Sequence, residues 1–143
     1  MTIEFKKLSE TLFIPLQNET KIKLQIDCVT KTGVIESYNN LILYIELTDD
    51  DKKKITEIEE EITKHFEGEF KHSILKNSNV GIYKLLKKNN KISAEIKTTG
   101  GNNKLYTTIK GKQNYNIELV LDYVWNRKDK YGFTWSIHKM QLI

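Results

Sequence analysis

Alternation of apolar and polar residues runs through most of this 143-residue chain and favours a fold built mainly from β-strands. In KIKLQIDC, residues 21–28, the apolar side chains fall at every second position, which is the period of a half-buried strand. LILYIEL, residues 41–47, is almost wholly apolar and predicts a strand covered on both faces. The strands expected from such patterns are 21–28, 41–47, 91–97, 105–110, 115–126 and 131–142. NRKD, residues 126–129, is expected to turn the last two into a hairpin.

One segment has a helical period instead. TDDDKKKITEIEEEITKHFEG places Ile55, Ile58, Ile62 and Phe66 three or four residues apart. Its acidic start, basic end and terminal glycine predict one amphipathic helix over about 49–66, with its polar face outward. Several antiparallel strands with one inserted helix predict a single mainly β (α+β) domain over residues 1–143, most simply a small barrel.

Charge is divided unevenly along the chain. Residues 1–70 contain nine lysines and fifteen acidic residues, a net charge of −6, whereas residues 71–143 contain thirteen lysines and one arginine against four acidic residues, a net charge of +10. The second half is therefore expected to attract a polyanion, although lysine also keeps strand edges soluble and unpaired. Lysine is a flexible point charge, so such a surface would hold phosphates and read few bases.

Aromatic residues are interleaved with these cations near the C-terminal end. Six rings lie between Tyr115 and Trp135, with Arg127, Lys128 and Lys130 at the expected turn. Single-stranded nucleic acid is held by this combination, because bases stack on the rings while basic groups follow the backbone. The same rings also fit a hydrophobic core. One strand would carry Leu119, Leu121, Tyr123 and Trp125 on one face, and the other would carry Tyr131, Phe133, Trp135 and Ile137. Paired across the hairpin, these two faces would form a core.

Catalytic patterns are scarce. The sequence contains no glycine-rich phosphate loop, HExxH motif or nucleophile elbow. We therefore expect no enzyme, no catalytic residue, no metal site and no cofactor. The single cysteine, Cys28, excludes an intramolecular disulfide and fits an intracellular setting, and no stretch has the ~20 apolar residues of a membrane span.

The order of several motifs resembles a known family. FIPL near the start, LILYIELTDDD before a helix, YKLLKKNNKISAEIK, a long YNIELVLDYVW strand and a closing KYGFTWSIHKMQLI are similar to single-stranded DNA-binding proteins of large DNA viruses and cytoplasmic linear plasmids. That family looks related to the T7-type phage single-stranded DNA-binding protein. The resemblance implies an OB-like barrel with an inserted helix, and a role in viral or plasmid DNA replication in the host cytoplasm or a replication compartment.

The resulting hypothesis is a non-catalytic protein that coats single-stranded DNA, or RNA, without sequence preference. Replication proteins and further copies of the chain are the other candidate partners. No interaction with a membrane is expected. The stacking candidates are Tyr106, Tyr115, Tyr131 and Trp135, with Trp125 as an alternative tryptophan beside the groove. The expected phosphate contacts are Lys84, Lys87, Lys88, Lys91, Lys104, Lys110, Lys112, Arg127, Lys128 and Lys130. The alternatives are a protein-interaction or structural subunit of a complex, and a barrel that encloses a small apolar ligand.

Overall fold

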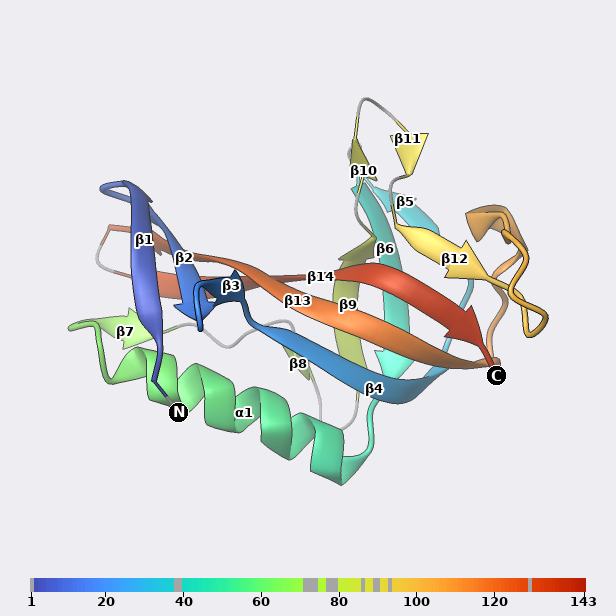
Figure 1. Ribbon diagram of the computed structural model, residues 1–143, viewed down its shortest axis with the longest axis horizontal. Coiled ribbons are helices and arrows are strands. Elements are labelled where there is room, and N and C mark those ends of the chain that lie inside the picture. The colour runs from blue at the N-terminus through green and yellow to red at the C-terminus, as the bar shows by residue number, and fades with distance from the viewer. Residues whose placement is uncertain are drawn as a thin grey trace.

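The computed structural model of the chain (Figure 1) describes residues 2–37, 40–70, 75–76, 80–85, 87–88, 91–92, 94–128 and 130–143. For residues 37, 40 and those between 75 and 92 it describes the backbone alone. Over the described residues the protein is mainly β with one α-helix, as the sequence predicts. The elements are β1 Glu4–Ser9, β2 Leu12–Gln17, β3 Thr20–Lys21, β4 Lys23–Thr30, β5 Ile35–Ser37, β6 Asn40–Glu46, α1 Asp49–Thr63, β7 Glu69–Phe70, β8 Leu75–Lys76, β9 Val80–Leu85, β10 Lys87–Lys88, β11 Lys91–Ile92, β12 Glu95–Lys97, the 3-10 turn η1 Tyr106–Thr108, β13 Asn114–Arg127 and β14 Lys130–Leu142.

Five strands form the centre of the main sheet, and each of them pairs with two of the others. β4 pairs with β13 and β6, β9 pairs with β6 and β14, and β13 and β14 pair with each other. These pairings are antiparallel except for β9 with β14, which run parallel. β13 and β14 are the longest strands and form the expected hairpin, in which Arg127 lies opposite Lys130.

A second hairpin extends the sheet at the turn end of β13. β1 and β2 pair antiparallel, and β2 continues onto β13 with Phe13 opposite Val124 and Leu12 opposite Trp125. The short β3 then pairs with β2. As Figure 1 shows, the β1–β2 hairpin and the turn of the β13–β14 hairpin lie at one end of the molecule, and the loop after β12 lies at the other.

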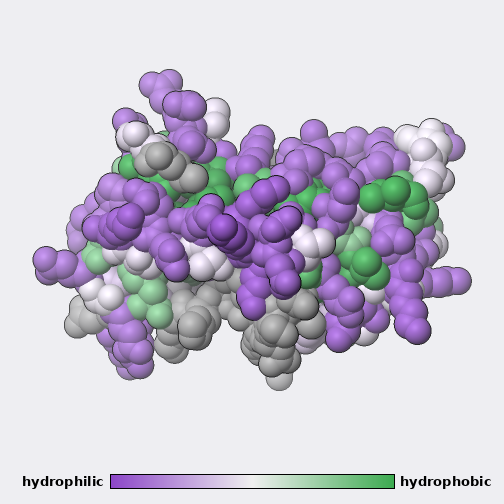
Figure 2. All heavy atoms as spheres, turned by 90° about the horizontal axis from the view of Figure 1, so that it is seen from below, coloured by the Kyte–Doolittle hydropathy of each residue, from purple (hydrophilic) through white to green (hydrophobic). Residues whose placement is uncertain are grey.

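The helix forms where its sequence predicts, but it is shorter. The Thr48 hydroxyl accepts a hydrogen bond from the Asp51 backbone N–H at 3.1 Å, which caps the first turn. The helix ends at Thr63 rather than near residue 66, and Gly68 lies beyond its C-terminus. Ile55, Ile58 and Ile62 are buried against the sheet. Figure 2, seen from the side on which α1 lies, shows a mainly hydrophilic surface there, so the outward face of the helix is polar as expected.

The core lies between the inward faces of the sheet and α1. Its largest fully buried side chains include Tyr115, Trp135 and Met140. A cluster of aromatic rings continues this core under the β1–β2 hairpin: Phe66 packs against Phe5, Phe13, Phe70 and Tyr131 at centroid distances between 4.9 and 6.2 Å.

Three local predictions are wrong. Residues 105–110 contain the 3-10 turn η1 rather than a strand, because the Thr108 hydroxyl and backbone N–H both donate to the Leu105 carbonyl, at 2.6 and 3.0 Å. Residues 91–97 form two short strands, β11 and β12, rather than one. β6 is a strand, but only one of its faces is buried; Ile42 and Tyr44 on the other face are half-buried. No helix in the described part of the chain is long and apolar enough to cross a membrane.

Candidate nucleic-acid interface

A β-bulge at Asp122 decides which side chains of β13 face outward. The pairing with β14 shifts between Leu121, opposite Trp135, and Tyr123, opposite Thr134, so Asp122 is an extra residue. Simple alternation would place Tyr123 and Trp125 in the core with Leu121. Instead, Leu121 and Val124 are fully buried, whereas Tyr123 and Trp125 are half-buried. The bulge has turned the two rings to the outside, as bulges next to functional sites often do.

The outward face of the hairpin beyond the bulge is here called the open face. It carries Tyr123, Trp125 and Arg127 on β13 and Lys130, Gly132 and Thr134 on β14. The prediction that Leu119, Leu121, Tyr123 and Trp125 share one face is therefore wrong, because the extra residue reverses the alternation. The corresponding prediction for β14 is confirmed: Phe133, Trp135 and Ile137 are buried, and Tyr131 is partly buried against them.

Trp125 lies across the hairpin on a glycine. Gly132 is its partner on β14, and a Cβ atom at Gly132 would come within 2.0 Å of the indole Cζ2. Only glycine lets the indole approach the strand this closely. The Arg127 guanidinium carbon lies 6.0 Å from the indole centroid, on the outer limit of a cation–π contact. The indole therefore lies closely against β14, with the Arg127 guanidinium at the outer limit of contact with the ring.

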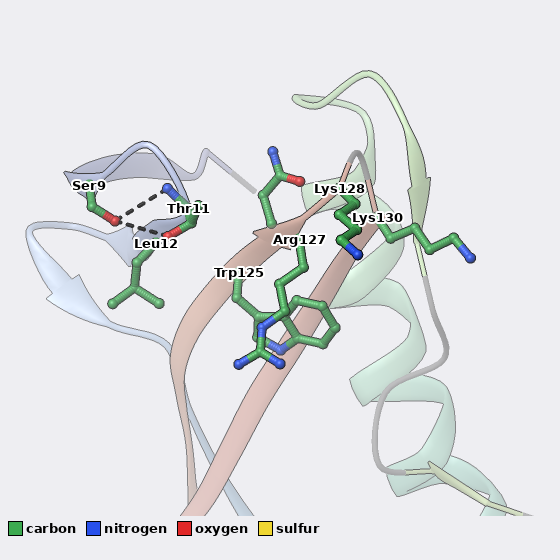
Figure 3. Close-up of a pocket in the computed structure, with 8 residues that line it drawn as sticks. Ser9, Thr11, Leu12, Trp125, Arg127, Lys128 and Lys130 are labelled. Atoms are coloured by element: carbon green, nitrogen blue, oxygen red, sulfur yellow. Dashed lines mark hydrogen bonds between the residues drawn. The ribbon is translucent and has the colours of Figure 1, made fainter.

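The ring borders an open groove of about 860 Å³ between the two hairpins, here called the Trp125 groove. Its lining is Ser9, Thr11, Leu12, Trp125, Asn126, Arg127, Lys128 and Lys130. Figure 3 shows the hydroxyls of Ser9 and Thr11 on one side, and Arg127 in front of the indole with Lys128 beside it. The Ser9 and Thr11 hydroxyl oxygens lie 3.3 Å apart.

Positive charge dominates this groove. Its described lining residues include three cations and no carboxylate, and none of these cations forms an ion pair with another described residue. Asn126 contributes a buried side-chain oxygen that has no hydrogen-bond partner among the described residues. The groove thus combines an aromatic face, three cationic side chains and polar groups.

The bulge itself is held by a polar cluster. The Asp122 carboxylate accepts a hydrogen bond from the Ser136 hydroxyl, lies 3.3 Å from Lys21 Nζ and lies 3.4 Å from His138 Nε2. His138 is the extra residue of a second bulge, on β14, between the partners of Glu118 and Leu119. Because Asp122 and the Ser136 hydroxyl both lie near the same nitrogen of His138, the cluster lacks the arrangement of a catalytic triad, in which serine and carboxylate bind opposite ring nitrogens.

Neither the cysteine nor the potential metal-ligating side chains form a reactive site among the described residues. Burial raises the pKa of the Cys28 thiol to about 12, with the negative charges of Asp27 and Asp51 adding to the effect, so the thiol stays protonated. Within the ranges that the structure describes, no three His, Cys, Asp or Glu side chains are grouped as a metal site would need.

Among the residues predicted for binding, Arg127, Lys128 and Lys130 come together in the Trp125 groove. Two predicted stacking residues are corrected. Tyr115 is fully buried with its hydroxyl donating to Gln113 Oε1 at 2.9 Å, and burial raises its pKa to about 12. Trp135 is 1% exposed, and its Nε1–H donates to Glu59 Oε2 at 3.0 Å. Both rings face the core because they lie on the inward side of their strands.

Tyr131, a third predicted stacking residue, is partly buried against the core. Its ring stacks on Phe70 at a centroid distance of 5.0 Å and packs against Phe66 at 5.1 Å. It is half-buried in the aromatic cluster, so it supports the hairpin from the face opposite Trp125.

A second group of predicted residues lies at the other end of β13. The Lys112 N–H donates to the Thr30 carbonyl, just before β13 begins, and Lys110 and Lys112 are exposed. Tyr106 is half-buried, with its hydroxyl donating to Glu36 Oε1 at 3.4 Å, and Lys104 Nζ donates to the Thr108 carbonyl. Since β13 has 14 residues, this group and the Trp125 groove are roughly 40 Å apart at ~3.3 Å per residue. The predicted residues therefore form two groups.

The remaining predicted contacts, Lys84, Lys87, Lys88 and Lys91, have side chains outside the described residues. The sequence prediction missed Ser9, Thr11 and Leu12, which come from the acidic half of the chain, and it did not select Tyr123. The available signal was Gly132 amid aromatic residues, because a glycine inside a strand often marks a bulge or the close approach of another group.

Comparison with known proteins adds no assignment: no family model, curated protein or solved structure matches the chain.

Proposed function

We propose that the protein binds single-stranded nucleic acid, chiefly DNA, in the Trp125 groove, without sequence preference and without catalysis. The observation that carries this proposal is the half-buried indole on Gly132, bordered by the three cations Arg127, Lys128 and Lys130. A base that stacks on such a ring contributes roughly 1 to 3 kcal/mol, and the cations neutralise the adjoining phosphates. Flexible lysines and one arginine give little base-specific reading.

Arg127 has room to admit a base over the indole. A base stacked between the indole and the guanidinium needs ~3.4 Å on each side, or roughly 7 Å between them. The present separation is 6.0 Å, and Arg127 is exposed, so an outward shift of about 1 Å suffices. Guanidinium planes stack on unpaired bases as aromatic rings do.

We also propose that the five central strands form an OB-like barrel. The support for this is that each of β4, β6, β9, β13 and β14 pairs with two of the others, so that their pairings form a cycle, as those of a five-stranded barrel would. OB folds hold oligonucleotides with the loops between strands 1 and 2 and between strands 4 and 5. In this arrangement the Trp125 groove adjoins the second of these loops, and Lys110 and Lys112 adjoin the first. The resemblance to viral and plasmid proteins extends the proposal to DNA replication.

A protein-binding role is the second candidate. Leu105 is 72% exposed and Ile35 is 43% exposed, and both lie near the contact between Tyr106 and Glu36. A partner protein would cover such side chains, whereas bases would be expected to stack on rings.

The experiment that separates the two candidates is a binding titration with oligo(dT), oligo(dA), mixed-sequence DNA, RNA and duplex DNA of equal length over a series of salt concentrations. Each phosphate contact on a single strand contributes about 0.7 to the slope of log K against log salt, so three groove cations predict a slope of roughly −2. Single strands should bind with similar affinities, and duplex much more weakly because its bases are already stacked. A flat salt response or absence of binding would contradict the proposal and favour the protein-binding role.

A further inference from the structure

Tyr123 repeats the arrangement of Trp125 one step further along the open face. It lies two residues before Trp125 on β13, on the same side of the strand, because the bulge precedes both of them. Residues two apart on a strand are separated by roughly 6.6 Å. Like Trp125, Tyr123 is half-buried, and its partner on β14, Thr134, is small.

Tyr123 also has its own cation. Lys21 Nζ, from β3, lies 5.5 Å from the Tyr123 ring centroid. The same amine lies 3.3 Å from the Asp122 carboxylate, whose side chain is only 11% exposed. The bulge residue therefore both turns Tyr123 outward and holds a lysine over its ring. Arg127 and Lys21 are thus two cations that lie over two neighbouring rings.

We propose that Tyr123 and Lys21 form a second nucleotide site, so that a bound strand leaves the Trp125 groove and continues along the open face toward β3. This inference rests on the proposed function and specifies the path of the strand. A base stacks on Tyr123, and Lys21 contacts the phosphate beside it.

The spacing of the two rings selects single strands. Stacked bases are ~3.4 Å apart, about half of the roughly 6.6 Å between Tyr123 and Trp125. Two successive bases therefore have to separate from each other before each can lie on its own ring. A flexible single strand allows that separation, whereas paired and stacked duplex does not.

A purely structural role for Tyr123 is the competing explanation, since Lys21, Asp122, Ser136 and His138 already form a connected cluster beside it. Removing the ring would then change stability without changing affinity. The two explanations differ in whether the bound nucleic-acid strand contacts Tyr123. The test therefore compares the affinities of variants that circular dichroism shows to be folded.

The test compares the affinities of the wild type, Tyr123→Leu, Tyr123→Phe and Trp125→Leu for oligo(dT) 12 nucleotides long, a length within the roughly 4 to 16 nucleotides that one OB fold covers. Tyr123→Leu is expected to bind oligo(dT) about 5- to 150-fold more weakly than the wild type, because it lacks one stacking ring. Tyr123→Phe, which restores a ring, should recover most of that loss. Lys21→Gln should also reduce the salt slope by about 0.7, whereas Lys53→Gln on α1 should leave the slope unchanged.

The outcomes separate this inference from the proposed function. If Tyr123→Leu binds as tightly as the wild type while Trp125→Leu is weakened, the second site is wrong and the Trp125 groove stands. The second site is also wrong if Lys21→Gln leaves the salt slope unchanged. If the wild type does not bind single strands at all, the proposed function fails and the second site fails with it.

Discussion

Replacing Arg127, Lys128 and Lys130 together with glutamate is expected to weaken binding to oligo(dT) roughly a thousandfold at ~0.05 M salt. Each phosphate contact contributes about 0.7 to the salt slope, which amounts to nearly one decade of affinity per contact at that salt concentration. The three side chains line one groove and have no ion-pair partner among the described residues, so their loss should not disturb the fold. Fluorescence anisotropy of a labelled oligonucleotide measures the effect.

The matched control is the glutamate triple at Lys52, Lys53 and Lys54, which changes the net charge by the same amount. These residues lie in α1, and Lys53 and Lys54 are exposed on its outward side. The control variant weakens only the long-range attraction, so it should lose much less affinity for oligo(dT) than the groove variant. The difference should be clearest at 0.1 M salt, where the Debye length is ~10 Å. Equal losses in both triples would mean that net charge, and not the groove, determines binding.

Trp135→Ala is expected to lower the free energy of unfolding by about 3 to 5 kcal/mol, as truncation of a large buried aromatic side chain usually does. Trp135 is 1% exposed and connects β14 to α1 through its hydrogen bond to Glu59. Truncation leaves a cavity between the sheet and the helix and removes that bond. Urea denaturation followed by circular dichroism, alongside the wild type, measures the change.

The same variant also tests which tryptophan faces the nucleic acid. Where Trp135→Ala remains folded, it should keep its affinity for oligo(dT), because its indole lies on the inward face. A variant that keeps its stability but loses binding would show that Trp135 is a stacking ring and that the inward assignment is wrong.

Much of the secondary structure follows from local sequence. The alternation in 21–28 predicts β4. The helical period and the acidic start predict α1, and the two aromatic strands joined at 126–129 predict the β13–β14 hairpin. These patterns are informative because one face of each element must be buried. Arg127, Lys128 and Lys130 follow from the same hairpin, since they flank its turn.

The orientation of the rings could not be predicted, because it depends on one extra residue. Alternation counted along β13 continues through Asp122 and assigns Trp125 to the core, whereas the bulge reverses the assignment for every residue after it. What stabilises the bulge comes from distant parts of the chain: Lys21 on β3, and Ser136 and His138 on β14. A one-dimensional pattern does not contain these contacts.

The side of the groove opposite the β13–β14 turn could not be predicted for a related reason. Ser9, Thr11 and Leu12 belong to a hairpin in the acidic half of the chain, and only the pairing of β2 with the end of β13 brings them beside Trp125. Charge counted by halves therefore drew attention to the cations that line the groove but not to its polar side.

Tryptophan fluorescence tests the central claim, that a base stacks on Trp125, most directly. The chain contains two tryptophans, and Trp125→Phe leaves only the buried Trp135. On titration with oligo(dT), the wild type is expected to lose emission as bases stack on Trp125, whereas the emission of Trp125→Phe should stay constant even when anisotropy shows that the oligonucleotide is bound. Binding by the wild type without any change in emission, or an equal loss of emission in both proteins, would contradict stacking on Trp125.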